Sequence, residues 1–170
     1  FDTRRKTSIA AGLARAVWNA LFLPRADVLV LEFGARAAGD MRDLLRVVQP
    51  DLAIVTELVP SYSEDQAGLA AMRQEMKELI DFLHQRGGMV AVCADDAALV
   101  ELVGPEGGHR FGREALVQED GARFLRIEGR TYPLTHEVVG DGNLYALAAS
   151  VVLAHHLGLG ETRIRAFLAP

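Results

Sequence analysis

Residues 88–94 read GMVAVCA, a run in which every residue after the glycine is apolar. Such a short, unbroken run is typical of a strand that is buried on both faces of a parallel sheet. Two other runs have the same character: DVLVLEF at Asp27–Phe33 follows Pro24, and DLAIVTEL at Asp51–Leu58 follows Pro50. We therefore predict a strand at each of these places.

The segments between the apolar runs have the spacing of helices. Leu, Met and Ile recur at helical intervals over Gly39–Val48 and over Asp65–Gln85. Strands that alternate with helices indicate βαβ units and a mostly parallel sheet flanked by helices, an α/β fold. Ligands of such sheets bind at the carboxyl ends of the strands. The side chains expected there are Glu32, those of the loop Thr56–Tyr62, and Asp95 with Asp96.

The pattern changes in the last third of the chain. Three short alternating runs follow one another and predict a small antiparallel β insertion with a hairpin at Asp120-Gly121. The runs are Arg113–Val117, Ala122–Glu128 and Arg130–Leu134. Two helices are then predicted, over Asn143–His156 and Glu161–Leu168.

Composition excludes several classes of protein. The 170 residues suit one domain, and the net charge of -5 argues against nucleic acid as the main partner. No apolar stretch reaches the ~20 residues that span a membrane. The single cysteine, Cys93, forms neither an internal disulfide nor a zinc site. A reducing, cytoplasmic compartment fits these features.

Few residues indicate a catalytic or binding role from the sequence pattern alone. The chain has no G-x-x-x-x-G-K-[ST] phosphate loop, and its five histidines show no metal spacing. Glu32 at a strand end either holds a metal, reaches solvent or pairs with an arginine such as Arg36. Lys77 lies mid-helix beside Glu75 and Glu78, which is typical of a solvated face. The residues alone therefore indicate an α/β domain with a small β insertion.

The order of several short motifs resembles the central, ATP-binding domain of the Mur ligase family, closest to the MurF type. The first stretch, VLVLEFGARAAGDMRDLLRVVQPDLAIVTEL, is similar to the family's E-x-G-A strand end, G-[DE]-[IM] helix start and P-D-x-A strand. C-A-D-D at Cys93–Asp96 resembles the family's N-A-D-D, and Arg110–Gly112 resembles the strand start that follows. The helix carrying Asn143 and the closing GETRIRAFLAP resemble the end of the domain.

This resemblance implies an ATP-dependent ligase of peptidoglycan precursor synthesis. A MurF-type enzyme joins D-alanyl-D-alanine to the precursor through an acyl phosphate, with ATP and Mg²⁺ as cofactors. On this resemblance Glu32 and a carbamylated Lys77 hold the magnesium, Lys77 is also catalytic, and Asn143 contacts adenine.

The chain also departs from the family pattern. Tyr62 stands where the family has a metal-binding histidine, and Ala146 replaces a second asparagine. We expect residues 1–170 to be one incomplete module without the family's first strand, phosphate loop and C-terminal ligase domain. Alone, it is expected to be inactive and to bind neither ATP nor Mg²⁺ tightly.

Two alternatives remain open. The chain is a non-catalytic Mur-like binding or scaffolding module, or it comes from another Mur-type amide ligase, such as one that acts on folate. The missing first strand predicts an exposed sheet edge beside Asp27–Phe33, through which copies of the chain self-associate.

Overall fold

The computed structural model describes residues 18, 27–35, 37–58, 66–105, 107–135 and 138–169 of the chain. The chain divides into two compact units, Phe1–Glu32 and Phe33–Pro170. Each unit is described by itself, and all the helices and strands named below belong to the second.

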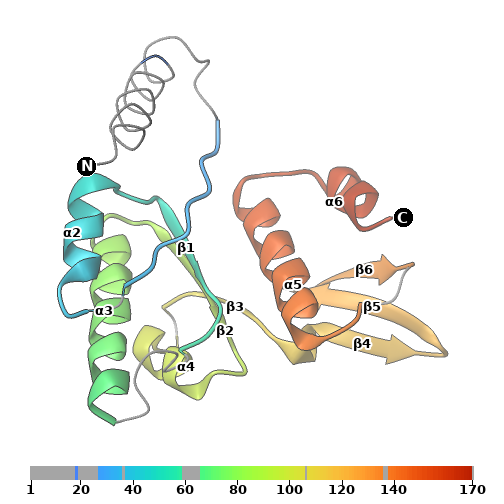
Figure 1. The fold of residues 1–170 in the computed structure, drawn as a ribbon. Coiled ribbons are helices and arrows are strands. Elements are labelled where there is room, and N and C mark those ends of the chain that lie inside the picture. The colour runs from blue at the N-terminus through green and yellow to red at the C-terminus, as the bar shows by residue number, and fades with distance from the viewer. Residues whose placement is uncertain are drawn as a thin grey trace, which may run out of the picture. The chain divides into compact units, whose positions relative to one another are not determined.

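A parallel sheet lies in the second unit. Its strands are β1 (Leu52–Val55), β2 (Met89–Cys93) and β3 (His109–Phe111), in the order β1-β2-β3 (Figure 1). Both pairings are parallel, with Ala53 opposite Val90 and Val92 opposite Arg110. The strands predicted at residues 51–58 and 88–94 are therefore confirmed, and so is the α/β class.

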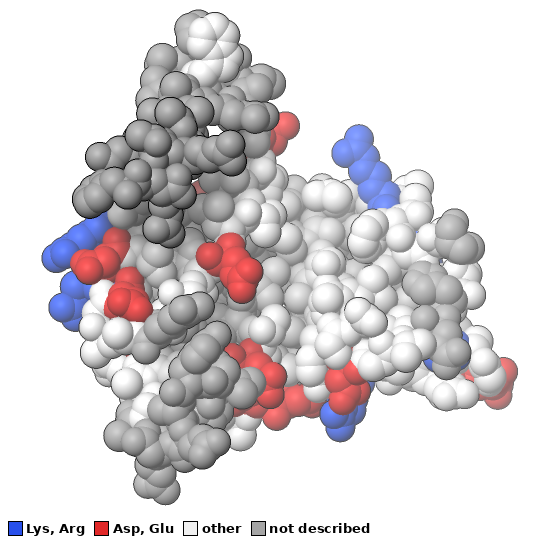
Figure 2. All heavy atoms as spheres, in the orientation of Figure 1, with Lys and Arg blue, Asp and Glu red and all other residues white. Residues whose placement is uncertain are grey.

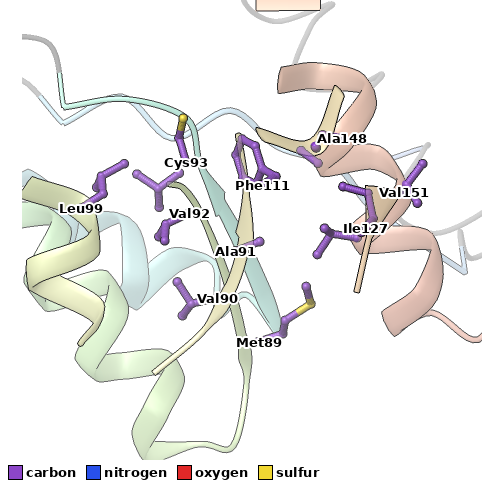
Figure 3. Close-up of a cluster of buried hydrophobic side chains, with 14 of the residues drawn as sticks. Met89, Val90, Ala91, Val92, Cys93, Leu99, Phe111, Ile127, Ala148 and Val151 are labelled. Atoms are coloured by element: carbon purple, nitrogen blue, oxygen red, sulfur yellow. The ribbon is translucent and has the colours of Figure 1, made fainter. Parts of the chain in front are cut away.

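The central strand β2 is buried on both faces. All five of its residues are at most 4% exposed. Figure 3 shows Val90 and Val92 on the side of Leu99, and Ala91 on the side of Ile127. Alternate side chains of one strand thus enter two different apolar layers, because successive residues of a strand point to opposite faces.

Three helices accompany this sheet. They are α2 (Asp40–Val47), α3 (Gln66–Gln85) and α4 (Ala97–Val103). Both α3 and α4 contact β2, and α2 packs on α3. The helices predicted over residues 39–48 and 65–85 are confirmed, whereas α4 was not predicted.

An antiparallel sheet follows β3. A short 3-10 helix, η1 (Arg113–Ala115), leads into β4 (Leu116–Glu119), β5 (Ala122–Ile127) and β6 (Arg130–Leu134), which pair in that order. Asp120 and Gly121 join β4 to β5 with φ angles of 49° and 78°, and this left-handed backbone suits a two-residue hairpin. The predicted insertion and its hairpin are confirmed. The first strand was predicted at Arg113–Val117, but Arg113–Ala115 form the 3-10 helix and the strand begins only at Leu116.

The last two helices pack on both sheets. They are α5 (Asp141–His156) and α6 (Glu161–Leu168). α5 contacts β2 and β3 of the parallel sheet and β5 of the antiparallel sheet, while α6 contacts β6. Both helices were predicted, and α5 begins two residues earlier than its apolar spacing indicated.

The strand predicted at Asp27–Phe33 is wrong. Residues 28–35 are in neither a helix nor a strand, and Val28, Leu29, Val30 and Leu31 are 51%, 72%, 81% and 47% exposed. A strand needs a neighbour for its backbone N–H and C=O groups, and an apolar run shows only that the side chains suit burial. The pattern cannot show whether the described chain provides that neighbour.

One buried carboxylate fixes the start of α2. Glu75 of α3 is 5% exposed, and its two oxygens accept hydrogen bonds from the amides of Gly39 (2.8 Å) and Met41 (2.7 Å). No side-chain N-cap is present at Gly39 itself. Glu75 therefore satisfies amides that have no partner within the first turn of α2.

We predict that Glu75→Gln lowers the free energy of unfolding by about 2 kcal/mol, because an amide presents only one acceptor atom and carries no charge. Urea denaturation of the 170-residue chain measures this loss. Glu101→Gln is the control: Glu101 forms an exposed ion pair with Arg73 (2.6 Å), so its loss should cost below about 1 kcal/mol. Equal effects of the two substitutions would contradict the role given to Glu75.

Candidate functional site

The carboxyl ends of β2 and β3 lie side by side, and two aspartates follow β2. Asp96 binds three amides: its Oδ1 accepts from Ala98 (2.9 Å) and Leu99 (3.2 Å), and its Oδ2 accepts from Leu58 (2.7 Å). The first two bonds cap α4, and the third holds the chain that leaves β1. Asp96 therefore fixes this edge of the sheet and has a structural role in the described chain.

Asp95 binds the elements that follow β3. Its Oδ2 accepts a hydrogen bond from the amide of Arg113 (2.7 Å). Gly112 lies against it, since a Cβ added there would come within 3.2 Å of Asp95 Oδ2 and 3.3 Å of the Ala94 Cβ. The hydrogen bond to Asp95, together with burial, raises the pKa of the Tyr145 hydroxyl.

The first turn of α5 completes this edge. Arg113 forms an exposed ion pair with Asp141, and this hydrogen bond raises the pKa of the guanidinium. Gly140 precedes the helix with a φ of 83°, and no side chain caps the helix start. Asn143 is exposed, and its side-chain amide donates to the carbonyl of Val139 (2.7 Å). Asn143, predicted to contact adenine, therefore lies on α5 two residues past its start.

The thiol of Cys93 lies beneath this edge and is not activated. Cys93 is 2% exposed, and burial raises the pKa of its thiol, while the neighbouring Asp95 charge adds to the effect. A protonated, buried thiol is a poor nucleophile. The edge consequently offers hydrogen bonds and one cation, Arg113, but no activated nucleophile among the residues named here.

The start of α5 presents backbone N–H groups that no side chain caps. The first N–H groups of a helix have no partner within the helix, and no side chain caps them here. A Cβ added at Gly140 or Gly142 would meet no atom within 4 Å, so the backbone is open to approach. The Asp141 carboxylate disfavours a phosphate at this point.

The two predicted metal ligands belong to different units of the chain. Lys77 lies on an exposed part of α3, and its Nζ pairs with Asp81 (2.5 Å) one turn away. Glu32 is exposed and belongs to the first unit. Within the described ranges, no three or more His, Cys, Asp or Glu side chains are grouped to hold a metal ion. Tyr62 and Arg36 lie outside the described residues.

Comparison with known proteins supports one family. The chain is 30% identical over 139 residues to UDP-N-acetylmuramate--L-alanine ligase of Ruegeria pomeroyi. This similarity supports the Mur ligase family. The match covers 69% of this chain and 29% of that ligase, so the chain spans less than a third of the relative's length. No protein-family model and no solved structure matches the chain.

The Mur ligase resemblance is thus supported at the level of the family, while the MurF type stays a prediction.

Acidic and basic side chains are interspersed over the described part of the face in Figure 2. In the part of the chain that the structure describes, no helix is both long enough and apolar enough to cross a membrane.

Three residues of this edge were not predicted from the sequence: Arg113, Asp141 and Tyr145. Arg113 reaches Asp141 across 28 residues, and no local pattern marks such a pair. A usable signal existed for Asp141, because an acidic residue after a glycine is common in the first turn of a helix.

We predict that Asp96→Ala lowers the free energy of unfolding by about 2 kcal/mol, because amides of two segments lose their acceptor at once. Chemical denaturation measures the loss. Asp43→Ala is the control. Among the described residues Asp43 pairs only with the exposed Arg46 (2.9 Å), so this substitution should cost below about 1 kcal/mol. An Asp96→Ala chain as stable as the control would show that Asp96 does not anchor this edge.

Proposed function

We propose that the chain is part of an ATP-dependent amide-bond ligase of peptidoglycan precursor synthesis. The observation that carries the proposal is the 30% identity over 139 residues to a ligase whose name pairs UDP-N-acetylmuramate with L-alanine. Such a reaction joins a carboxylate to an amine. ATP supplies the phosphoryl group that activates the carboxylate, in line with the acyl phosphate implied by the resemblance.

The chain's own part in this reaction is to bind the nucleotide at the carboxyl edge of the sheet. Asn143 contacts adenine at the open start of α5, as the resemblance implies. Asp95 supports this position, because it holds both the amide of Arg113 and the hydroxyl of Tyr145 on α5. Arg113, now paired with Asp141, is the cation nearest to the helix start by these contacts.

The identity of the amine substrate is also part of this proposal. The MurF-type resemblance implies D-alanyl-D-alanine, whereas the name of the matched relative contains L-alanine. The roles of Glu32 and a carbamylated Lys77 as magnesium ligands also stay predictions. The ion pair of Lys77 with Asp81 must break for Lys77 to take that role.

A non-catalytic, Mur-like binding module is the second candidate. Two observations favour it: Tyr62 replaces the metal-binding histidine of the family pattern, and Lys77 is engaged by Asp81 on an exposed helix face. A neutral phenol is a poor ligand for magnesium. Nucleotide binding at α5 distinguishes the two candidates.

We predict that millimolar ATP shifts the backbone amide signals of the first turn of α5 and of Arg113 in NMR spectra of the ¹⁵N-labelled chain. Asn143→Ala should weaken this binding about tenfold, because one hydrogen bond to the base is lost. Ser150→Ala is the matched control, since Ser150 is exposed on the same helix and, among the described residues, its hydroxyl bonds only the carbonyl of Ala146 (2.7 Å).

ATP that shifts no signal at α5 would contradict the nucleotide site and favour the binding module. ATP that shifts these signals equally in the native chain and in Asn143→Ala would remove Asn143 from the site.

Self-association is a further proposal for this chain. β1 is an edge strand of the described parallel sheet, and Ile54 on it is 36% exposed. Exposed edges pair with other chains, and a charge placed on them opposes pairing.

We predict a monomer–dimer equilibrium in sedimentation experiments, weakened by Ile54→Lys. Val47→Lys, at a position 83% exposed on α2, is the control and should leave the equilibrium unchanged. A strict monomer at high concentration would refute this proposal.

A further inference from the structure

The side chain of one glutamate is the centre of a hydrogen-bonded network that joins the two sheets and α5. Glu128 lies in the turn between β5 and β6, with a φ of 50°. One of its oxygens binds Nδ1 of His109 on β3, and the other binds Nδ1 of His155 on α5 (2.9 Å). The Nε2 of His155 lies 2.5 Å from the hydroxyl of Tyr132 on β6.

All these atoms are satisfied when both histidines are neutral. Each Nδ1–H donates to one oxygen of the Glu128 carboxylate, which leaves Nε2 of His155 with a lone pair. That lone pair accepts the hydroxyl hydrogen of Tyr132. Tyr132 is fully buried, and among the described residues no buried side-chain nitrogen or oxygen lacks a partner.

A proton on His155 disrupts this arrangement. Both ring nitrogens of a protonated histidine are donors, so Nε2–H would point at the Tyr132 hydroxyl instead of accepting from it. The hydroxyl hydrogen would then have to turn away. Within the described contacts, Nε2 of His155 is the one hydrogen-bond partner of that hydroxyl. A buried donor without an acceptor is unfavourable.

The other groups that face the network are mostly basic. The ring of His156 lies 6.3 Å from that of His109, and the Arg165 guanidinium of α6 lies 5.4 Å from the ring of Tyr132. Arg165 also binds Glu161 (2.6 Å) and the carbonyl of Thr131. Glu128 is therefore the carboxylate that accepts hydrogen bonds from both histidines. Protons that bind to the histidines add positive charge around it.

The Glu128 carboxylate stays ionised to low pH. Burial raises the pKa of Glu128, but hydrogen bonds from His155 and His109 and their charges outweigh burial, so the pKa is lowered overall. A lowered pKa in the folded state contributes stability above the ordinary pKa of Glu, and this contribution is lost as pH falls through the folded value. The carboxylate thus remains an acceptor over the range in which histidines titrate, between about pH 5 and 8.

We propose that Glu128, His109, His155 and Tyr132 form a pH-responsive switch between the antiparallel sheet, the parallel sheet and α5. In the closed state His155 is neutral, protonated on Nδ1, and Tyr132 donates to its Nε2. The side chain of His109 is 41% exposed and donates from Nδ1 to Glu128. Protonation of His155, whose side chain is 8% exposed, opens the bond to Tyr132 and loosens β6 from α5.

Tyr132→Phe tests this switch, because it keeps the ring and removes the hydroxyl that holds His155 neutral. NMR titration of the histidine rings should show the midpoint of His155 at higher pH in Tyr132→Phe than in the native chain. The stability difference between the two proteins should shrink as pH falls from about 8 to 5. Tyr145→Phe is the control, since Tyr145 bonds Asp95 and should leave the His155 midpoint unchanged.

An unchanged His155 midpoint in Tyr132→Phe would overturn the proposal. The native chain gives a second test that needs no variant: ¹⁵N chemical shifts at neutral pH should show His155 with a proton on Nδ1 and none on Nε2. A proton on Nε2 at neutral pH would also overturn it.

Discussion

Burial of β2 on both faces is the constraint on which the second unit depends. A strand covered on one side by α3 and α4 and on the other by α5 must be apolar at every position, as Met89–Cys93 is. Both apolar layers therefore pack on the same strand, which is held in place by its backbone hydrogen bonds to β1 and β3. Loss of this strand would expose the two apolar layers together (Figure 3).

The candidate site follows from where that strand ends. Two aspartates follow β2 after Ala94. Asp96 binds amides of the chain after β1 and of the first turn of α4, and Asp95 binds an amide of the chain after β3. On this sheet α5 contacts β2 and β3, and Asp95 raises the pKa of Tyr145 on α5. The edge proposed to bind the nucleotide is thus built from carboxylates whose hydrogen bonds also hold the fold together.

Sequence patterns predicted the elements whose signals are local. The apolar run at β2, the helical spacing of α3 and the Asp120-Gly121 hairpin each depend on neighbouring residues. The strand at Asp27–Phe33 was wrong because an apolar run does not specify a pairing partner. The Lys77–Asp81 pair is local and matches the solvated-face interpretation. The network at Glu128 spans up to 27 residues and leaves no local pattern, so only the structure shows it.

Native-state hydrogen exchange tests most directly whether β2 holds the two layers together. The amides of Val90, Ala91 and Val92 should exchange only through global unfolding and should be among the slowest in the chain. The amides of the antiparallel sheet and of α6 should exchange faster, through local opening. Amides of β2 that exchange as fast as those of β4 would contradict the account, because the central strand would then open without unfolding the layers around it.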